Sequence, residues 1–201
     1  MIYLNRFIYV LYFSLLLSGD ANHLIFNRIC INPSQGEMVE IYNPTSETIN
    51  LSNYYLSDWN GYYNWINDDD SNLSTQDFLI KFPNDMQIGS QQSISISTQS
   101  SNDFLSYYGY EPDISIIETE FEISNIGSNA NLSNSQEMLI LFYWDGNSNI
   151  IQDVDYFLWG GNSQAVSKTT AEGYMYNDTS IDNQLFIRNY GSSAYSDSLY
   201  V

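Results

Sequence analysis

Apolar and polar side chains alternate most clearly between residues 37 and 58, and this alternation has the period of two that half-buried β-strands show. The apolar positions in it are Val39, Ile41, Ile49 and Leu51. The run Asn-Pro-Thr-Ser at 43–46 is typical of a turn, because proline fixes φ while asparagine and serine hydrogen-bond to nearby backbone. The segment therefore predicts two strands, over 37–43 and 48–58, joined by a polar turn.

Similar short apolar segments recur along the chain and predict further strands. They lie at 23–31, 78–82, 93–98, 137–144 and 150–157. The last two are separated by Asp145-Gly146, which favours a hairpin turn. Residues 99–135 are the least patterned, with one helical turn or more expected at 103–110. Many short strands and no long helical stripe predict an all-β fold, most simply a two-sheet sandwich.

The first 21 residues have the composition of a signal peptide. Arg6 precedes the apolar run 7–17, and small residues lead to an expected cleavage site after Ala21. An uncleaved membrane anchor is the alternative, although the run is short for a membrane span. We therefore expect a secreted or cell-envelope protein with no membrane span after cleavage. The expected organisation is a signal peptide at 1–21, a sandwich domain at 22–160 and a partly ordered C-terminal extension at 161–201 that can pack on the sandwich.

Charge and composition exclude several classes of function. The net charge of −19 comes from 24 acidic and 5 basic residues, which argues against nucleic-acid binding because a basic patch is needed. His23 is the single histidine and lies at the expected mature N-terminus, where it cannot serve a catalytic triad or a histidine-rich zinc site. Cys30 lies between two isoleucines and is expected to be a buried, inert thiol. No catalytic residue is predicted.

An aromatic loop follows the second predicted strand of the opening pattern and is the candidate ligand site. Its side chains are Trp59, Tyr62, Tyr63 and Trp65. Exposed aromatic faces can stack on sugar rings, with nearby Asn and Asp side chains bonding the hydroxyls. The alternative is that these rings cover the open end of the sandwich, because aromatic residues also dominate cores.

Acidic and amide side chains around the same loop suggest a calcium site. The candidate ligands are Asp58, Asn60, Asp68, Asp69 and Asp70. Hard oxygen ligands suit calcium, but the spacing is not that of an EF-hand. A solvated acidic surface is the alternative, and no cofactor besides calcium is suggested.

Several of these segments in combination resemble the lamin-tail domain. The matching segments are Val39-Glu40-Ile41-Tyr42-Asn43-Pro44, Ile49-Asn50-Leu51-Ser52, Tyr55-Leu56-Ser57-Asp58, Phe82-Pro83, Ile94-Ser95-Ile96, Val154-Asp155-Tyr156 and Trp159-Gly160. The resemblance implies an immunoglobulin-like β-sandwich, similar to non-catalytic modules of secreted bacterial proteins, with no catalytic residue to carry over. We expect structural roles for the motif residues Glu40, Asn43, Pro44 and Asp58. Asn43 is expected to set the turn and Glu40 to accept hydrogen bonds from loop amides.

Three hypotheses of function follow. The first is an exported interaction module that binds protein or glycan at the cell surface through the loop from Trp59 to Trp65. The second is a hydrolase with paired carboxylates, which a cleft holding two facing carboxylates with a raised pKa would favour. The third is a surface protein that self-associates through an edge strand containing Ile94 and Ile96. The oligomeric state stays open.

Overall fold

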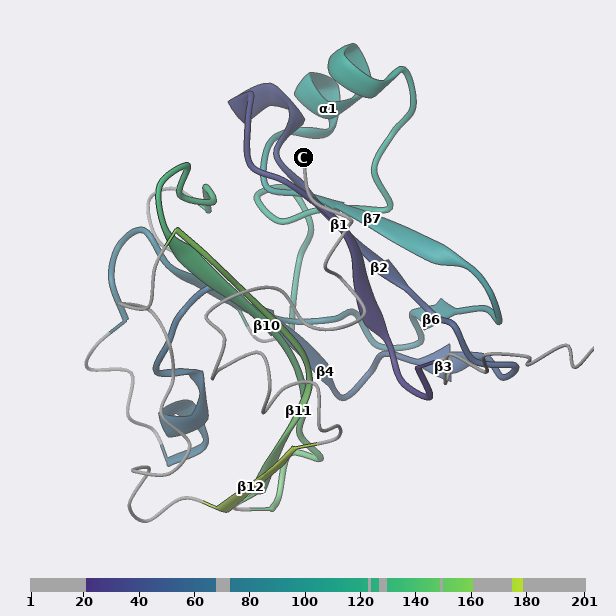
Figure 1. Cartoon of the computed structure of the whole chain (residues 1–201), viewed down its shortest axis with the longest axis vertical. Coiled ribbons are helices and arrows are strands. Elements are labelled where there is room, and N and C mark those ends of the chain that lie inside the picture. The colour runs from purple at the N-terminus through teal and green to yellow at the C-terminus, as the bar shows by residue number, and fades with distance from the viewer. Residues whose placement is uncertain are drawn as a thin grey trace, which may run out of the picture.

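The computed structural model describes residues 21–67, 73–122, 124–126, 130–148, 150–160 and 175–178. They form two main β-sheets, a small third sheet and a few helical segments (Figure 1). The strands are β1 (Ile25–Cys30), β2 (Met38–Tyr42), β3 (Ile49–Asn50), β4 (Tyr54–Ser57), β5 (Phe78–Lys81), β6 (Gln87–Ile88), β7 (Ser93–Ser97), β8 (Ile114–Ser115), β9 (Ser124–Ile126), β10 (Glu137–Tyr143), β11 (Ile150–Trp159) and β12 (Met175–Asp178). The helices are the 3₁₀ segments η1 (Ser34–Gly36) and η2 (Tyr62–Asn67) and the α-helix α1 (Ser101–Tyr108).

The strands are ordered so that each main sheet combines segments distant in sequence. The first sheet has the order β1-β2-β7-β8 and the second has the order β12-β11-β10-β4-β5-β9, while β3 and β6 pair separately. Most pairs are antiparallel, and β7–β8 and β11–β12 are parallel. The two main sheets enclose one continuous hydrophobic core, so the predicted all-β sandwich is confirmed.

One buried carboxylate ties the two sheets together. Asp155 on β11 accepts a hydrogen bond from the backbone N–H of Phe26 on β1, with a nitrogen–oxygen distance of 2.6 Å. Its other oxygen accepts from the N–H of Tyr156 at 2.9 Å. Because Phe26 lies in the outer strand of the first sheet, Asp155 supplies an acceptor that no neighbouring strand provides there.

The second sheet is buried on both faces, which explains its apolar strands. All five residues from Met138 to Phe142 on β10 are buried, although a strand with one solvated face would alternate. The rings of Tyr55 and Phe142 stack with centroids 5.0 Å apart, and Tyr62 of η2 packs against Phe142 at 5.3 Å. The 3₁₀ segment η2 thus covers the face of this sheet that points away from the first sheet.

The predicted strands are found close to their expected positions, except that 48–58 divides into two. Asn50 accepts a hydrogen bond from the N–H of Ser52 at 2.8 Å, and this turn separates β3 from β4. The expected helical turn at 103–110 is α1, whose N-cap Ser100 accepts from the N–H of Asp103 at 3.1 Å. Gly109, with φ of +80°, ends it in the left-handed conformation.

The prediction of an associating edge at Ile94 and Ile96 is wrong. These residues lie in β7, which pairs with β2 on one side along its whole length. On the other side β7 pairs with β8, and Asp113 accepts hydrogen bonds from the N–H of Ser95 at 2.7 Å and from its hydroxyl at 2.9 Å. The strand is interior, so its backbone is not available to a second copy.

The two predicted terminal segments lie almost wholly outside the described residues. Of the expected signal peptide only Ala21 is described, and it is buried. Of the expected extension at 161–201, the strand β12 is described, and it extends the second sheet beside β11. Within the described residues, no helix is both long and apolar enough to cross a membrane.

Candidate functional site

The aromatic loop does not present its rings as a binding platform. Trp59 is 1% exposed and Tyr62 is fully buried, and the hydroxyl of Tyr62 donates to Asp153 at 2.8 Å. Tyr63 and Trp65 are partly buried, and Trp65 packs against Tyr55 with centroids 5.5 Å apart. The hypothesis is therefore corrected for Trp59 and Tyr62, since a buried ring has no face for a sugar. For Tyr63 and Trp65 it stays a prediction.

The proposed calcium ligands are not brought together in the part of the chain that the structure describes. Asp58 is 2% exposed, and its Oδ1 accepts from the N–H of Phe78 at 2.6 Å, so it joins β4 to β5 rather than facing solvent. Asn60 is partly exposed, and the run 68–70 lies outside the described residues. No group of three or more His, Cys, Asp or Glu in metal-binding geometry occurs among the described residues.

Asn43, the central residue of the motif, organises the turn that follows β2. Its buried side-chain amide donates to the carbonyls of Glu47 at 2.7 Å, Ile88 at 3.0 Å and Gly89 at 3.1 Å. Its Oδ1 accepts from the N–H and the hydroxyl of Thr45 at 3.0 and 2.7 Å. Pro44 follows in the turn, partly buried. The side chain thus holds its own turn to the segment after β6.

Glu40 has a different role from the expected one. It accepts hydrogen bonds from the side chains of Asn27 and Arg28 on β1, the latter at 3.5 Å. These partners lie on the neighbouring strand, because Glu40 pairs with Arg28 across the β1–β2 ladder. Glu40 is therefore a cross-strand partner of β1, and among the described residues no loop amide donates to it.

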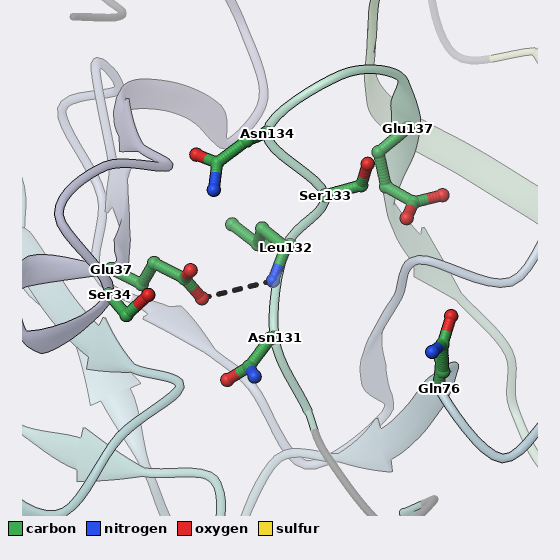
Figure 2. A pocket seen from close by; sticks show the side chains of 8 residues that line it. All are labelled: Ser34, Glu37, Gln76, Asn131, Leu132, Ser133, Asn134 and Glu137. Carbon is green, nitrogen blue, oxygen red and sulfur yellow. Dashed lines mark hydrogen bonds between the residues drawn. The ribbon is translucent and has the colours of Figure 1, made fainter.

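A polar cleft lies at one end of the sandwich, where β2 and β10 begin (Figure 2). Its volume is about 290 Å³. The lining comes from η1, the strand starts and two loops, and consists of Ser34, Glu37, Gln76, Asn131, Leu132, Ser133, Asn134 and Glu137. Hydroxyl, amide and carboxyl groups predominate, and the described part of the chain contributes no Lys, Arg or His to the lining.

The two carboxyl groups of the cleft differ in their surroundings. Glu37 is 1% exposed, and its Oε2 accepts from the N–H of Leu132 and the hydroxyl of Thr98, each at 3.0 Å. Burial raises the pKa of Glu37 above its ordinary value, although these hydrogen bonds oppose the effect. Burial, with a contribution from the charge of Asp77, raises the pKa of Glu137 to about 7. Near neutral pH Glu137 therefore exists in both protonation states.

Paired-carboxylate hydrolysis finds no support in this geometry. In Figure 2 the Glu37 carboxyl group points to the backbone of Leu132, while the Glu137 carboxyl group points to another part of the cleft. Glycoside cleavage requires two carboxyl groups held across one scissile bond. Glu37 instead joins the start of β2 to the loop before β10, a structural task.

The raised pKa of Glu137 predicts that the stability of the protein depends on pH. Because the folded-state pKa of Glu137 is raised to about 7 from 4.5, its contribution to stability is fully present below about pH 4.5 and is lost as the pH rises to about 7. Glu137→Gln, which keeps an acceptor for the N–H of Met138, should raise the melting temperature by a few degrees at pH 8 and leave it nearly unchanged at pH 4.

Thermal unfolding of both proteins at the two pH values measures this difference. The matched control is Glu120→Gln, since Glu120 is exposed and should show an equally small shift at both pH values. A change in melting temperature for Glu137→Gln that is the same at both pH values would contradict the raised pKa of Glu137 as its cause.

Sequence patterns did not identify the cleft. Its residues lie in four separate segments of the sequence. Glu37 and Glu137 each precede a run of apolar residues, and a glutamate at the start of a strand is too common to indicate a site. One signal in the sequence was that both glutamates occur at strand starts, and the packing of the two sheets places these starts at the same end of the sandwich.

Comparison with known proteins identifies one family. The family model described as Lamin Tail Domain matches residues 18–158, which is more than half of the chain. No curated protein matches the chain.

Proposed function

Because the chain belongs to the lamin tail domain family, an immunoglobulin-like interaction module, we propose that it binds a protein or glycan at the cell surface without transforming it. The polar cleft between Glu37 and Glu137 is the binding site in this proposal. It replaces the loop from Trp59 to Trp65, in which two of the four rings are buried.

The observation that carries the proposal is the composition of the cleft. Its lining offers side-chain oxygens from two carboxyl groups, three amides and two hydroxyls, so it suits a ligand with several hydrogen-bond donors. Sugar hydroxyls and peptide amides both meet this requirement. The neutral form of Glu137 can also donate a hydrogen bond. With a pKa of about 7, this side chain can act as donor or as acceptor near neutral pH.

The composition of the first 21 residues and the charge of the chain favour a partner outside the cell. The signal-peptide composition of residues 1–21 and the net charge of −19 both suit a soluble module in the periplasm or outside the cell. The acidic surface disfavours anionic lipids and nucleic acids as ligands.

Arrays of glycans and peptides, probed with the full chain, test this proposal. The double variant Gln76→Ala/Asn134→Ala removes two cleft amides and should weaken binding of the best ligand at least about fivefold, as expected for two hydrogen bonds of ~0.5–1.5 kcal/mol each. The matched control is Gln87→Ala/Asn102→Ala, which removes two exposed amides elsewhere.

The control should bind as tightly as the wild-type chain. A ligand whose affinity is the same for both double variants would show that the cleft is not the site. Turnover of an array ligand, lost on substitution of one glutamate, would replace the binding role with a catalytic one.

A further inference from the structure

A second groove opens at the opposite end of the second sheet. The strand β10 begins with Glu137 at the polar cleft and ends with Tyr143 at this groove, which is about 20 Å away for a seven-residue strand. The volume of the groove is about 360 Å³, within the range of small-molecule sites. The two sites share no lining residue.

The groove is built on one row of paired residues across three adjacent strands. Tyr143 on β10 lies opposite Tyr54 on β4 and opposite Gln152 on β11. Because directly paired residues point to the same face of a sheet, the two rings and the amide form one continuous surface. All three side chains are partly buried, so they are held in place yet reach the solvent.

The two tyrosine rings are arranged edge to face. Their centroids are 5.4 Å apart and their planes are inclined by 76°. In such a pair the ring that contributes its edge keeps its faces clear of its partner. The hydroxyl of Tyr143 accepts a hydrogen bond from the Asn53 side chain at 3.4 Å, which further orients the ring.

The remaining lining is neutral amides, an imidazole and aliphatic carbon. Asn22 and His23, which hydrogen-bond to each other at 3.1 Å, face the groove with Gln152, and Ile49 and Val154 supply apolar surface. Among the residues that the structure describes, no carboxylate lines it, although the chain carries a net charge of −19. The nearest acidic residues in sequence, Asp153 and Asp155, are buried and bond to Tyr62 and Phe26.

We propose that this groove binds a sugar unit of a neutral glycan, with the C–H face of the pyranose ring packed on a tyrosine and its hydroxyls bonded to Asn22 and Gln152. Such a ligand has an apolar face and a polar rim, which is the combination that the groove presents. The described lining offers no carboxylate to a cation, and a nucleotide would bring phosphates to a strongly acidic protein. The site is independent of the polar cleft.

Titration of the full chain with neutral saccharides tests this inference. Glucose, galactose, mannose, N-acetylglucosamine and their short oligomers are added, and binding is followed by calorimetry and by saturation-transfer NMR. Tyr143→Ala should weaken the best ligand at least tenfold, while Tyr143→Phe, which keeps the ring, should stay within about threefold. Gln152→Ala should weaken it about fivefold, a readout that remains if Tyr143→Ala does not fold.

The cleft variant Gln76→Ala/Asn134→Ala separates this site from the proposed interaction site, because it should bind the saccharide as tightly as the wild type. Failure of every neutral saccharide to bind the wild-type chain would overturn the inference. Binding that is equal in the wild type, Tyr143→Ala and Gln152→Ala would also overturn it, and binding lost only in the cleft variant would assign the glycan to the cleft.

Discussion

Trp59→Ala should lower the free energy of unfolding by about 3–5 kcal/mol, the range for removing a large buried aromatic side chain. The indole is 1% exposed and belongs to the main core, so its loss leaves a cavity that the surrounding strands fill only in part. Gly61 lies so close that a Cβ there would come within 2.5 Å of the ring. Equilibrium denaturation with urea measures the change.

Two further variants sharpen this experiment. Trp59→Phe keeps most of the ring and removes a buried indole N–H that has no hydrogen-bond partner among the described residues, so it should cost clearly less than Trp59→Ala. Ile117→Ala, at a side chain that is 52% exposed, should change stability by less than about 0.5 kcal/mol. If Trp59→Ala is as stable as the wild-type protein, Trp59 does not belong to the core.

Asn43→Ala should lower the free energy of unfolding by about 3 kcal/mol, through hydrogen bonding rather than volume. The amide donates to three carbonyls, and alanine leaves the buried ones without a donor. The turn after β2 loses its side-chain connection to the segment 88–89, since the Asn43 amide contacts Glu47, Ile88 and Gly89, while the backbone bonds of Asn43 to Gln91 and Gln92 remain. Urea denaturation followed by tryptophan fluorescence measures the loss.

Asn43→Asp separates the donor from the acceptor function of this side chain. The carboxylate can still accept from Thr45, but it places a charged oxygen beside carbonyls to which the amide donated. We therefore expect Asn43→Asp to be at least as unstable as Asn43→Ala at neutral pH, with partial recovery at pH 4. An aspartate as stable as asparagine at pH 7 would show that the three donated bonds contribute little.

The strands follow from sequence wherever one face meets the core. In β2, Val39 and Ile41 are buried while Glu40 and Tyr42 are partly exposed, which is the alternation that identified this strand. The division of 48–58 was missed, because the apolar positions Ile49 and Leu51 continue the alternation through the turn. The side-chain bond from Ser52 to Asn50, which marks the turn, resembles any polar pair in the sequence.

The aromatic loop shows why burial was harder to predict than strands. Trp59, Tyr62 and Trp65 have the composition of a sugar platform and equally that of a core. The buried position of Tyr62 depends on its hydrogen bond to Asp153, which lies 91 residues further along the chain, and no local sequence pattern connects the two residues. The polar cleft was missed for a related reason, since only the packing of the two sheets brings Glu37, Gln76 and Glu137 to one place.

The order of strands in the second sheet has a consequence for synthesis of the chain. The first sheet is complete once residue 115 has been made, whereas β4 waits for its partner β10, which begins at residue 137. Until then a nascent chain leaving the ribosome carries β4 with one edge unpaired and without the β10 side chains that pack beside it. The edge of β4 that later pairs with β10 therefore stays open to pairing with another chain until β10 has been made.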